Sequence, residues 1–186
     1  YFGMMMVETG DADAFITGLY TKYSNTIKLV NEVIGIRPEY NHFGTMHIIN
    51  SPKGTLYIAD TLVNENPDTD TLVDISKLAA TAVRFFNEKP VISMISHSNF
   101  GSSNSDGAQK VRDAVDKMQQ LYPDLAIDGE MQINFALNRE LRDEQYGFSR
   151  LKGKDVNTLV FPNLTSARAS YKMMQMLDAD DEIIGP

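Results

Sequence analysis

The sequence predicts an α/β fold in three layers, with a largely parallel sheet and one β-hairpin. Short apolar segments typical of strands alternate along the chain with longer segments whose apolar residues repeat every 3.6 positions, as in helices. This alternation favours a parallel sheet covered by helices. One connection differs, because Ser51-Pro-Lys-Gly54 is a four-residue turn with Pro and Gly between two neighbouring strand segments. Such a short turn indicates an antiparallel hairpin.

Short apolar segments, several of them rich in β-branched residues, are expected to form the strands. They are residues 14–17, 45–49, 55–59, 91–95, 125–127 and 157–161, with a further strand-like segment at residues 182–185.

The helices are predicted from periodicity and from capping residues. Residues 72–86 have the clearest 3.6-residue pattern, and Pro67-Asp68-Thr69 is expected to mark the start of this helix. A second helix is expected over residues 108–121, opened by Asn104 or Ser105 and ended before Pro123. A third is expected over residues 164–177, whereas residues 138–154 are polar and predict short helices and a surface loop.

Length and composition fit a single globular domain over residues 1–186, and they exclude several classes of partner. The formal net charge of −8 argues against nucleic acid, whose phosphates require clusters of Lys and Arg. The chain has no cysteine, which excludes disulfides and thiolate metal sites, and no apolar run approaches the roughly 20 residues of a membrane span. We therefore expect a cytoplasmic protein with no membrane partner.

Both ends of the sequence suggest a piece of a longer chain. Tyr1-Phe-Gly-Met-Met-Met-Val7 begins inside an apolar helical pattern, and Pro186 directly follows the strand-like segment. We expect a fragment truncated at both ends.

The segment Ile92–Ser105 is a candidate binding loop. It runs from a strand through small polar residues and Gly101 into a helix, where ligands of parallel sheets commonly bind. Its amides are candidates for an anion nest. It matches neither the lysine-containing phosphate-binding loop nor the nucleophile turn of hydrolases. The alternative is an ordinary connection in which Asn104 or Ser105 only caps the helix.

Two pairs of carboxylates are further candidates for a functional site. Asp128-Gly-Glu130 follows a predicted strand, so its carboxylates are candidates for acid–base work or for ordering a partner, and a capped turn is the alternative. Asp11 and Asp13 have no neighbouring histidine and make a poor metal site. We predict no metal site in this chain.

The remaining candidates are the histidines and one basic stretch. His42, His47 and His97 lack metal-ligand spacing, and structural or solvated roles are favoured for them. Residues 149–154 are the only concentrated basic stretch in this acidic chain. This stretch either attracts an anionic ligand or forms a solvated surface loop.

Several motifs together, in this order and spacing, resemble the phosphate acetyl/butyryl transferase family. They are Gly10-Asp-Ala-Asp-Ala-Phe-Ile-Thr-Gly18, Ser24-Asn-Thr-Ile-Lys28, Ser96-His-Ser-Asn-Phe-Gly-Ser102, Pro123-Asp-Leu-Ala-Ile-Asp-Gly-Glu-Met-Gln132, Val160-Phe-Pro-Asn-Leu164 and Tyr171-Lys172. The forms Ser98-Asn-Phe-Gly-Ser102, Asp128-Gly-Glu-Met-Gln132 and Phe148-Ser-Arg-Leu-Lys-Gly153 are most similar to the phosphotransacetylase-like C-terminal domain of bacterial NADP-dependent malic enzymes.

The resemblance implies an isolated piece of the two-domain phosphotransacetylase fold, in which a cleft binds coenzyme A (CoA). By position in the family motifs, the implied contacts to CoA or phosphate are Ser24, Thr26, Lys28, Ser98, Asn99, Phe100, Gly101 and Ser102.

Three departures from the family pattern argue against transfer chemistry in this chain. Lys28 stands where the family has a phosphate-binding Arg, and Ala167-Arg168 stands where it has Gly-Asn. The family's catalytic Ser-Arg-Gly stretch is expected to lie beyond residue 186. We therefore assign no catalytic residue here.

The implied function is regulatory. The resemblance implies a domain that binds acetyl-CoA or CoA and mediates a homodimer or higher homo-oligomer. NADP and a divalent metal would serve the malic enzyme domains of the same parent chain. The alternative is a phosphate acetyltransferase, which passes acetyl between CoA and phosphate.

Overall fold

The structure is a computed structural model that describes residues 1–17, 22–52, 54–177 and 182–185. Gly18 of the first family motif and Lys53 of the predicted turn lie outside the described residues. The chain divides into two compact units, residues 1–41 and 42–186. A single domain over all 186 residues stays a prediction.

The unit of residues 1–41 is helical. It contains α1 (Phe2–Glu8) and α2 (Tyr23–Val33), and the Tyr1 hydroxyl donates a 2.6 Å hydrogen bond to Glu32 Oε2. The strand predicted at residues 14–17 is wrong: this segment is irregular, and Ile16 is 96% exposed. A strand needs a hydrogen-bonded neighbour, and no described residue of this unit forms one.

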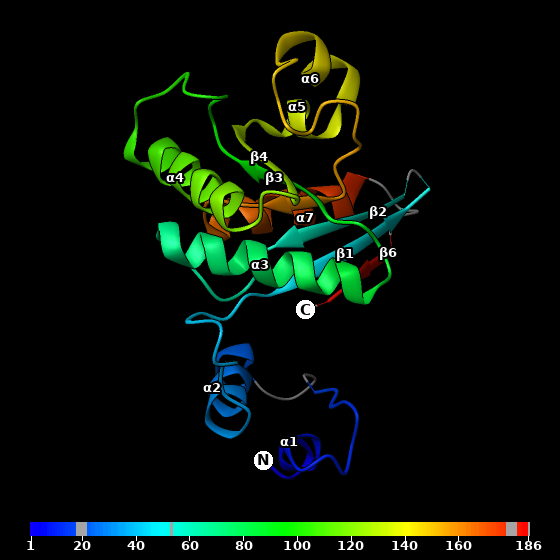
Figure 1. The fold of residues 1–186 in the computed structure, drawn as a ribbon. Coiled ribbons are helices and arrows are strands. Elements are labelled where there is room, and N and C mark those ends of the chain that lie inside the picture. Colours follow the sequence, from blue (N-terminus) through cyan, green and yellow to red (C-terminus); the bar gives the residue numbers. More distant parts are fainter. Residues whose placement is uncertain (18–21, 53, 178–181, 186) are drawn as a thin grey trace. The chain divides into compact units, whose positions relative to one another are not determined.

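The sheet of the unit 42–186 has six strands in the order β4-β3-β5-β2-β1-β6 (Figure 1). The strands are β1 (Met46–Ser51), β2 (Gly54–Ala59), β3 (Val91–Ile95), β4 (Ala126–Met131), β5 (Thr158–Val160) and β6 (Glu182–Ile184). The pairs from β4 through β3 and β5 to β2 are parallel. β1 is antiparallel to β2 and to β6, and Ser51 pairs with Gly54 at the turn. The predicted largely parallel sheet with one hairpin is confirmed.

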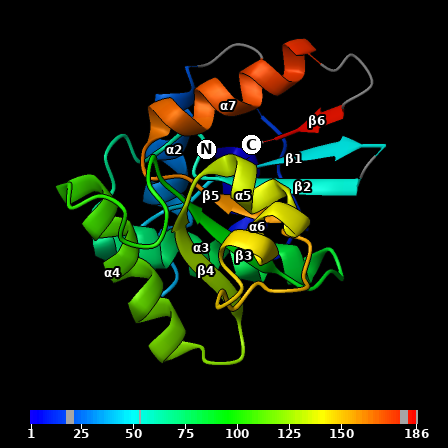
Figure 2. The same ribbon diagram turned by 90° about the horizontal axis from the view of Figure 1, so that it is seen from above.

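Helices cover both faces of this sheet, which gives three layers (Figures 1 and 2). α3 (Thr69–Phe85) and α4 (Asp106–Leu121) pack on one face through a core that includes Leu72, Ile75 and Val111. α5 (Ile133–Leu137) and α7 (Leu164–Leu177) pack on the other face through a second core. α6 (Arg139–Gln145) lies in the polar segment of residues 138–154, for which short helices and a surface loop are predicted.

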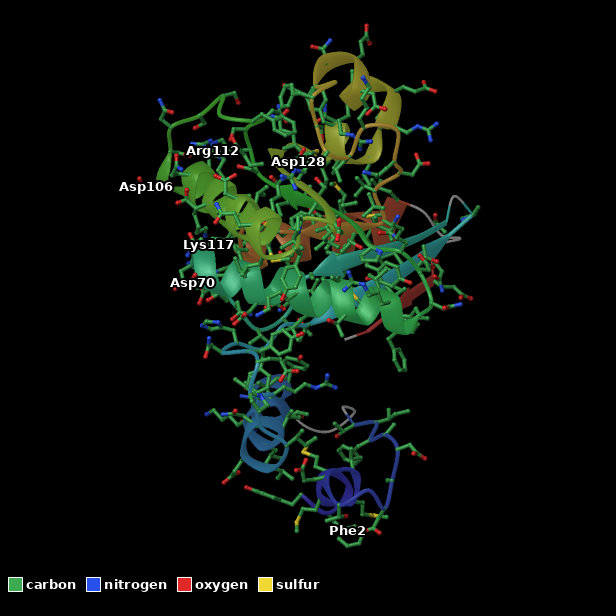
Figure 3. The ribbon with its side chains drawn as sticks, viewed as in Figure 1. Phe2, Asp70, Asp106, Arg112, Lys117 and Asp128 are labelled. Atoms are coloured by element: carbon green, nitrogen blue, oxygen red, sulfur yellow. The ribbon has the colours of Figure 1, made fainter. Side chains whose placement is uncertain are left out.

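The start of α3 is capped, and an exposed ion pair joins the two long helices. The Asp68 side chain accepts a 2.8 Å hydrogen bond from the Thr71 amide, which confirms the predicted start of α3. Lys117 Nζ of α4 lies 2.7 Å from Asp70 Oδ1 of α3 (Figure 3). This ion pair is exposed, so it contributes little to stability, and the buried apolar faces hold α3 and α4 together.

Candidate functional site

The structure places the predicted contacts in two groups. Ser24, Thr26 and Lys28 lie on the first two turns of α2, with the Ser24 and Lys28 side chains exposed. Residues 98–102 follow β3 in the unit 42–186, at the carboxyl edge of the parallel strands. The five loop residues are brought together, whereas the α2 residues belong to the other unit.

A fully buried carboxylate organises the loop at residues 98–102. Glu130 of β4 is 0% exposed, and its Oε1 atom accepts hydrogen bonds from Ser98 Oγ at 2.7 Å and from the Gly101 amide at 3.1 Å. Arg112 Nη1 of α4 (Figure 3) donates to the same oxygen at 2.8 Å. A buried charge needs such partners, so Glu130 ties the loop to both the sheet and α4.

The loop is closed further by bonds among its own residues. The Asn99 amide donates to Ser102 Oγ at 2.9 Å, and the Ser102 amide donates to the Asn99 carbonyl at 3.0 Å. The Phe100 amide donates to the Glu130 carbonyl at 2.8 Å. With the Gly101 amide on Glu130, all four amides of residues 99–102 have internal acceptors. They are therefore not available as an anion nest in this conformation.

The turn has an unusual backbone that the bonds to Glu130 support. Phe100 has φ = 44° and Gly101 has φ = 89°, a region that residues with a side chain rarely adopt. The Phe100 ring contacts Tyr146 at 4.9 Å and Phe148 at 5.0 Å between centroids, and Phe148 is 72% exposed. The loop thus contributes Phe100 to an aromatic cluster with Tyr146 and Phe148.

The expectation that Asp128-Gly-Glu130 forms a turn after a strand is wrong, because all three residues lie inside β4. Gly129 has φ = 148°, and a Cβ atom at this position would lie 2.5 Å from the Met94 carbonyl oxygen. Only glycine allows β4 to continue beside β3 here. The strand therefore extends past the three residues predicted from apolar character.

Asp128 orders a second loop rather than an external partner. It is buried on β4 (Figure 3), and its Oδ2 atom accepts hydrogen bonds from Ser149 Oγ at 2.7 Å and from the Arg150 amide at 2.8 Å. Gln119 of α4 donates to Oδ1 at 3.3 Å. Both carboxylates of this motif thus bind segments of the chain itself.

Ser105 caps α4, which decides between the two predicted caps. Its side chain accepts a 3.3 Å hydrogen bond from the Ala108 amide. His97 Nε2 lies 3.3 Å from Ser103 Oγ and 3.4 Å from Ser105 Oγ. His97 therefore contributes to the helix start, as a structural role would require.

Sequence reasoning missed a buried aspartate at the end of β2. Asp60 is 3% exposed and accepts hydrogen bonds from the amides of Leu62 at 3.1 Å and Asn64 at 2.7 Å. The Thr45 hydroxyl also donates to Asp60. The available signal was a polar residue directly after a strand, at the edge where ligands of parallel sheets bind.

For His47, whose predicted role is structural or solvated, the environment is structural. Its ring stacks on Tyr171 at 4.2 Å, and its Nδ1 lies 2.8 Å from Thr61 Oγ1. Burial lowers the pKa of His47, and the nearby cations Lys172 and Arg168 lower it further. The neutral imidazole is therefore favoured in the folded protein.

Neither a metal cluster nor a membrane helix is present in the described part of the chain. No group of three or more His, Asp or Glu side chains there could hold a metal ion. Asp11 instead accepts a 2.7 Å hydrogen bond from Thr9. Among the described helices, none is long and apolar enough to cross a membrane.

Comparison with known proteins gives one consistent match. A family model described as phosphate acetyl/butaryl transferase matches residues 1–186. An NADP-dependent malic enzyme of Salmonella typhimurium is 40% identical over 184 residues, which are 99% of this chain and 24% of that enzyme. A phosphate acetyltransferase of Acetivibrio thermocellus is 32% identical over 193 aligned residues, covering all of this chain and 58% of that protein.

A solved structure shares the whole fold. The crystal structure of a phosphotransacetylase from Streptococcus pyogenes superposes with a TM-score of 0.90 at 31% identity, covering all of this chain and 56% of that one. The chain thus spans about a quarter of the malic enzymes it matches and a little over half of the acetyltransferases.

Proposed function

Because the chain belongs to the phosphate acetyl/butyryl transferase family, we propose that it is the regulatory, acetyl-CoA-binding domain of a malic enzyme. The main support is the 40% identity to a malic enzyme of which this domain makes up 24%, against 32% identity to the acetyltransferase. In the parent protein, malate is oxidatively decarboxylated with NADP on a separate domain. NADP and the divalent metal would bind on that separate domain.

The loop at residues 98–102 supports ligand recognition at a preorganised surface. Glu130 and Arg112 fix its shape without a ligand, so binding costs little ordering entropy. Its amides are occupied, and Asn99 Oδ1 accepts a 2.8 Å hydrogen bond from the Gln132 amide, so the ligand contacts fall to the Asn99 Nδ2 group and the Phe100 ring. An aromatic and amide surface suits the adenine or acyl part of acetyl-CoA.

The predicted contacts on α2 suit the phosphates of the same class of ligand. Lys28 is exposed and carries a positive charge, and Ser24 offers an exposed hydroxyl. A lysine attracts phosphate as a point charge, without the bidentate geometry of arginine. Such contacts favour binding of CoA over transfer of acetyl between CoA and phosphate.

Homo-oligomerisation is the second part of this proposal. Regulation through an added domain needs a route by which ligand binding changes the catalytic domain, and a homodimer built on this domain supplies one. Size measurement of the full-length protein tests this part separately.

Titration of the full-length protein with acetyl-CoA, while malate-dependent NADPH formation is followed, tests the regulatory part. We expect a change in rate or in the half-saturating malate concentration, and Lys28→Ala should weaken this response. Lys22→Ala is the matched control, because Lys22 is also an exposed lysine at the start of α2. An unchanged rate and unchanged half-saturation at saturating acetyl-CoA would reject regulation.

The alternative function is a phosphate acetyltransferase. It is favoured by a match that covers all of this chain and 58% of such an enzyme, and by the TM-score of 0.90 to a phosphotransacetylase. Formation of acetyl-CoA from acetyl phosphate and CoA by the full-length protein would support it. The length of the full protein also distinguishes the malic enzyme from the acetyltransferase. The domain should form about a quarter of a malic enzyme but over half of an acetyltransferase.

A further inference from the structure

A depression of about 390 Å³ lies at the amino ends of β3 and β4. Three connections meet there: Lys89 lies just before β3, residues 123–126 lead into β4, and Arg150 and Lys154 come from the loop before β5. Because β3 and β4 are parallel, this is the opposite edge of the sheet from the loop at residues 98–102.

Positive charge dominates the lining of this depression. It holds Lys89, Arg150 and Lys154 but only one carboxylate, that of Asp124, in a chain whose net charge is −8. Lys154 Nζ donates to the Arg150 carbonyl at 2.7 Å. Within the described part of the chain, the Arg150 guanidinium and the Lys89 ammonium have no hydrogen-bond or ion-pair partner.

Two buried charged groups hold the loop that carries these cations. Arg142 is 0% exposed and donates to the carbonyls of Leu151 at 3.0 Å and Lys154 at 2.6 Å. Buried Asp128 accepts from the Arg150 amide at 2.8 Å. The backbone at both Arg150 and Lys154 is therefore fixed from inside the protein, and the two side chains start from set positions.

We propose that this depression binds a small organic phosphate. The guanidinium of Arg150 matches two phosphate oxygens in a bidentate geometry, and Lys89 and Lys154 add point charges. Pro123 and Leu125 line the same depression and offer apolar contact to a short carbon skeleton. The volume exceeds that of a phosphate ion alone and lies in the range of small-molecule sites, about 300–1,000 Å³.

Calorimetric titration of the full-length protein with glycerol 2-phosphate tests the proposal, with inorganic phosphate and glycerol as comparison probes. We expect the phosphate ester to bind with a dissociation constant below about 1 mM, inorganic phosphate to bind more weakly, and glycerol not to bind. Arg150→Ala should weaken binding of the ester about tenfold, the effect of about 1.4 kcal/mol. Arg150→Lys should weaken it less, because the charge is kept.

Lys152→Ala is the matched control. It removes one exposed positive charge from the same loop but lies outside the lining of the depression, so binding should change less than about twofold. Circular dichroism of each variant verifies folding. Equal weakening by Arg150→Ala and Lys152→Ala would mean that the ester is attracted only by the general positive charge of the loop, and would overturn the proposed site. Absence of ester binding would also overturn it.

Two further measurements separate this site from the acetyl-CoA site proposed above. Lys28→Ala should leave binding of the ester unchanged, and saturating acetyl-CoA should not displace the ester. Displacement by acetyl-CoA would mean that the ester binds at the CoA site, and would overturn the separate site. Failure of acetyl-CoA regulation would not affect the ester titration.

Discussion

The two edges of the parallel sheet use buried charges in different ways. At the carboxyl edge, Glu130 binds Ser98, Gly101 and Arg112, so the polar groups of that loop are largely consumed inside the protein. At the amino edge, buried Arg142 binds backbone carbonyls, and the Arg150 and Lys154 side chains of the loop have no carboxylate partner among the described residues. A buried charge thus rigidifies a loop in both places, but only at the amino edge does it leave charge for an external ligand.

Glu130→Gln should have the largest effect, because it removes the carboxylate that the carboxyl-edge loop shares with Arg112. Gln keeps the shape and one acceptor but leaves Arg112 without its charge partner. We expect a loss of about 2 kcal/mol in the free energy of unfolding by urea.

A double-mutant cycle with Arg112→Met completes this test. The double variant should be less destabilised than the sum of the single variants, because the two groups interact directly. Additive effects, or a loss under about 0.5 kcal/mol for Glu130→Gln, would contradict the role assigned to Glu130.

Arg142→Met should come next and tests the amino edge. It leaves the carbonyls of Ala136, Leu151 and Lys154 without their donor, which should cost between about 1 and 2 kcal/mol in urea unfolding. It should also weaken binding of glycerol 2-phosphate, although Arg142 does not line the depression. Unchanged ester binding would show that the loop needs no internal support.

Ser105→Ala should have a smaller effect, at the helix start beyond the carboxyl-edge loop. Loss of the cap on the Ala108 amide should reduce the free energy of unfolding by about 1 kcal/mol. Asn104→Ala is the control, because Asn104 is the alternative cap predicted from sequence, and its effect should stay within about 0.5 kcal/mol. The reverse order would mean that Asn104 caps α4.

The pH dependence of stability that His47 causes should be the smallest effect. His47 lies on β1, so this measurement probes β1. The pKa of His47 is lowered from its ordinary 6.5 in the folded protein, mainly by burial. The unfolded chain therefore binds more protons just below pH 6.5, and stability should fall as the pH drops through this range.

His47→Gln cannot titrate and should flatten the dependence of Tm on pH between about 7.5 and 5.5. The comparison is one of slopes, since the substitution also changes the stacking on Tyr171. An unchanged slope would contradict the role assigned to His47.

Most of the fold could be predicted from sequence because its signals are local. The 3.6-residue pattern of α3, the cap at Asp68 and the turn before Gly54 each involve neighbouring residues. The segment at residues 14–17 looked equally strand-like, but a strand also needs a partner, and the partner is a tertiary property. The prediction of a turn at residues 128–130 was wrong for a related reason. These residues lie inside β4 because Gly129 allows close contact with Met94, and this contact is also a tertiary property.

By itself, the sequence determined the order of the main strands and helices between residues 45 and 177, the family, and the residues of the loop at 98–102. Only the tertiary structure decided what those residues do, because hydrogen bonds between Ser98 and Glu130 join positions far apart in the chain. The same holds for the cationic depression, whose Lys89 and Arg150 come together only when two strands align in parallel. Local patterns fix secondary structure, whereas the partner of a charge is fixed by packing.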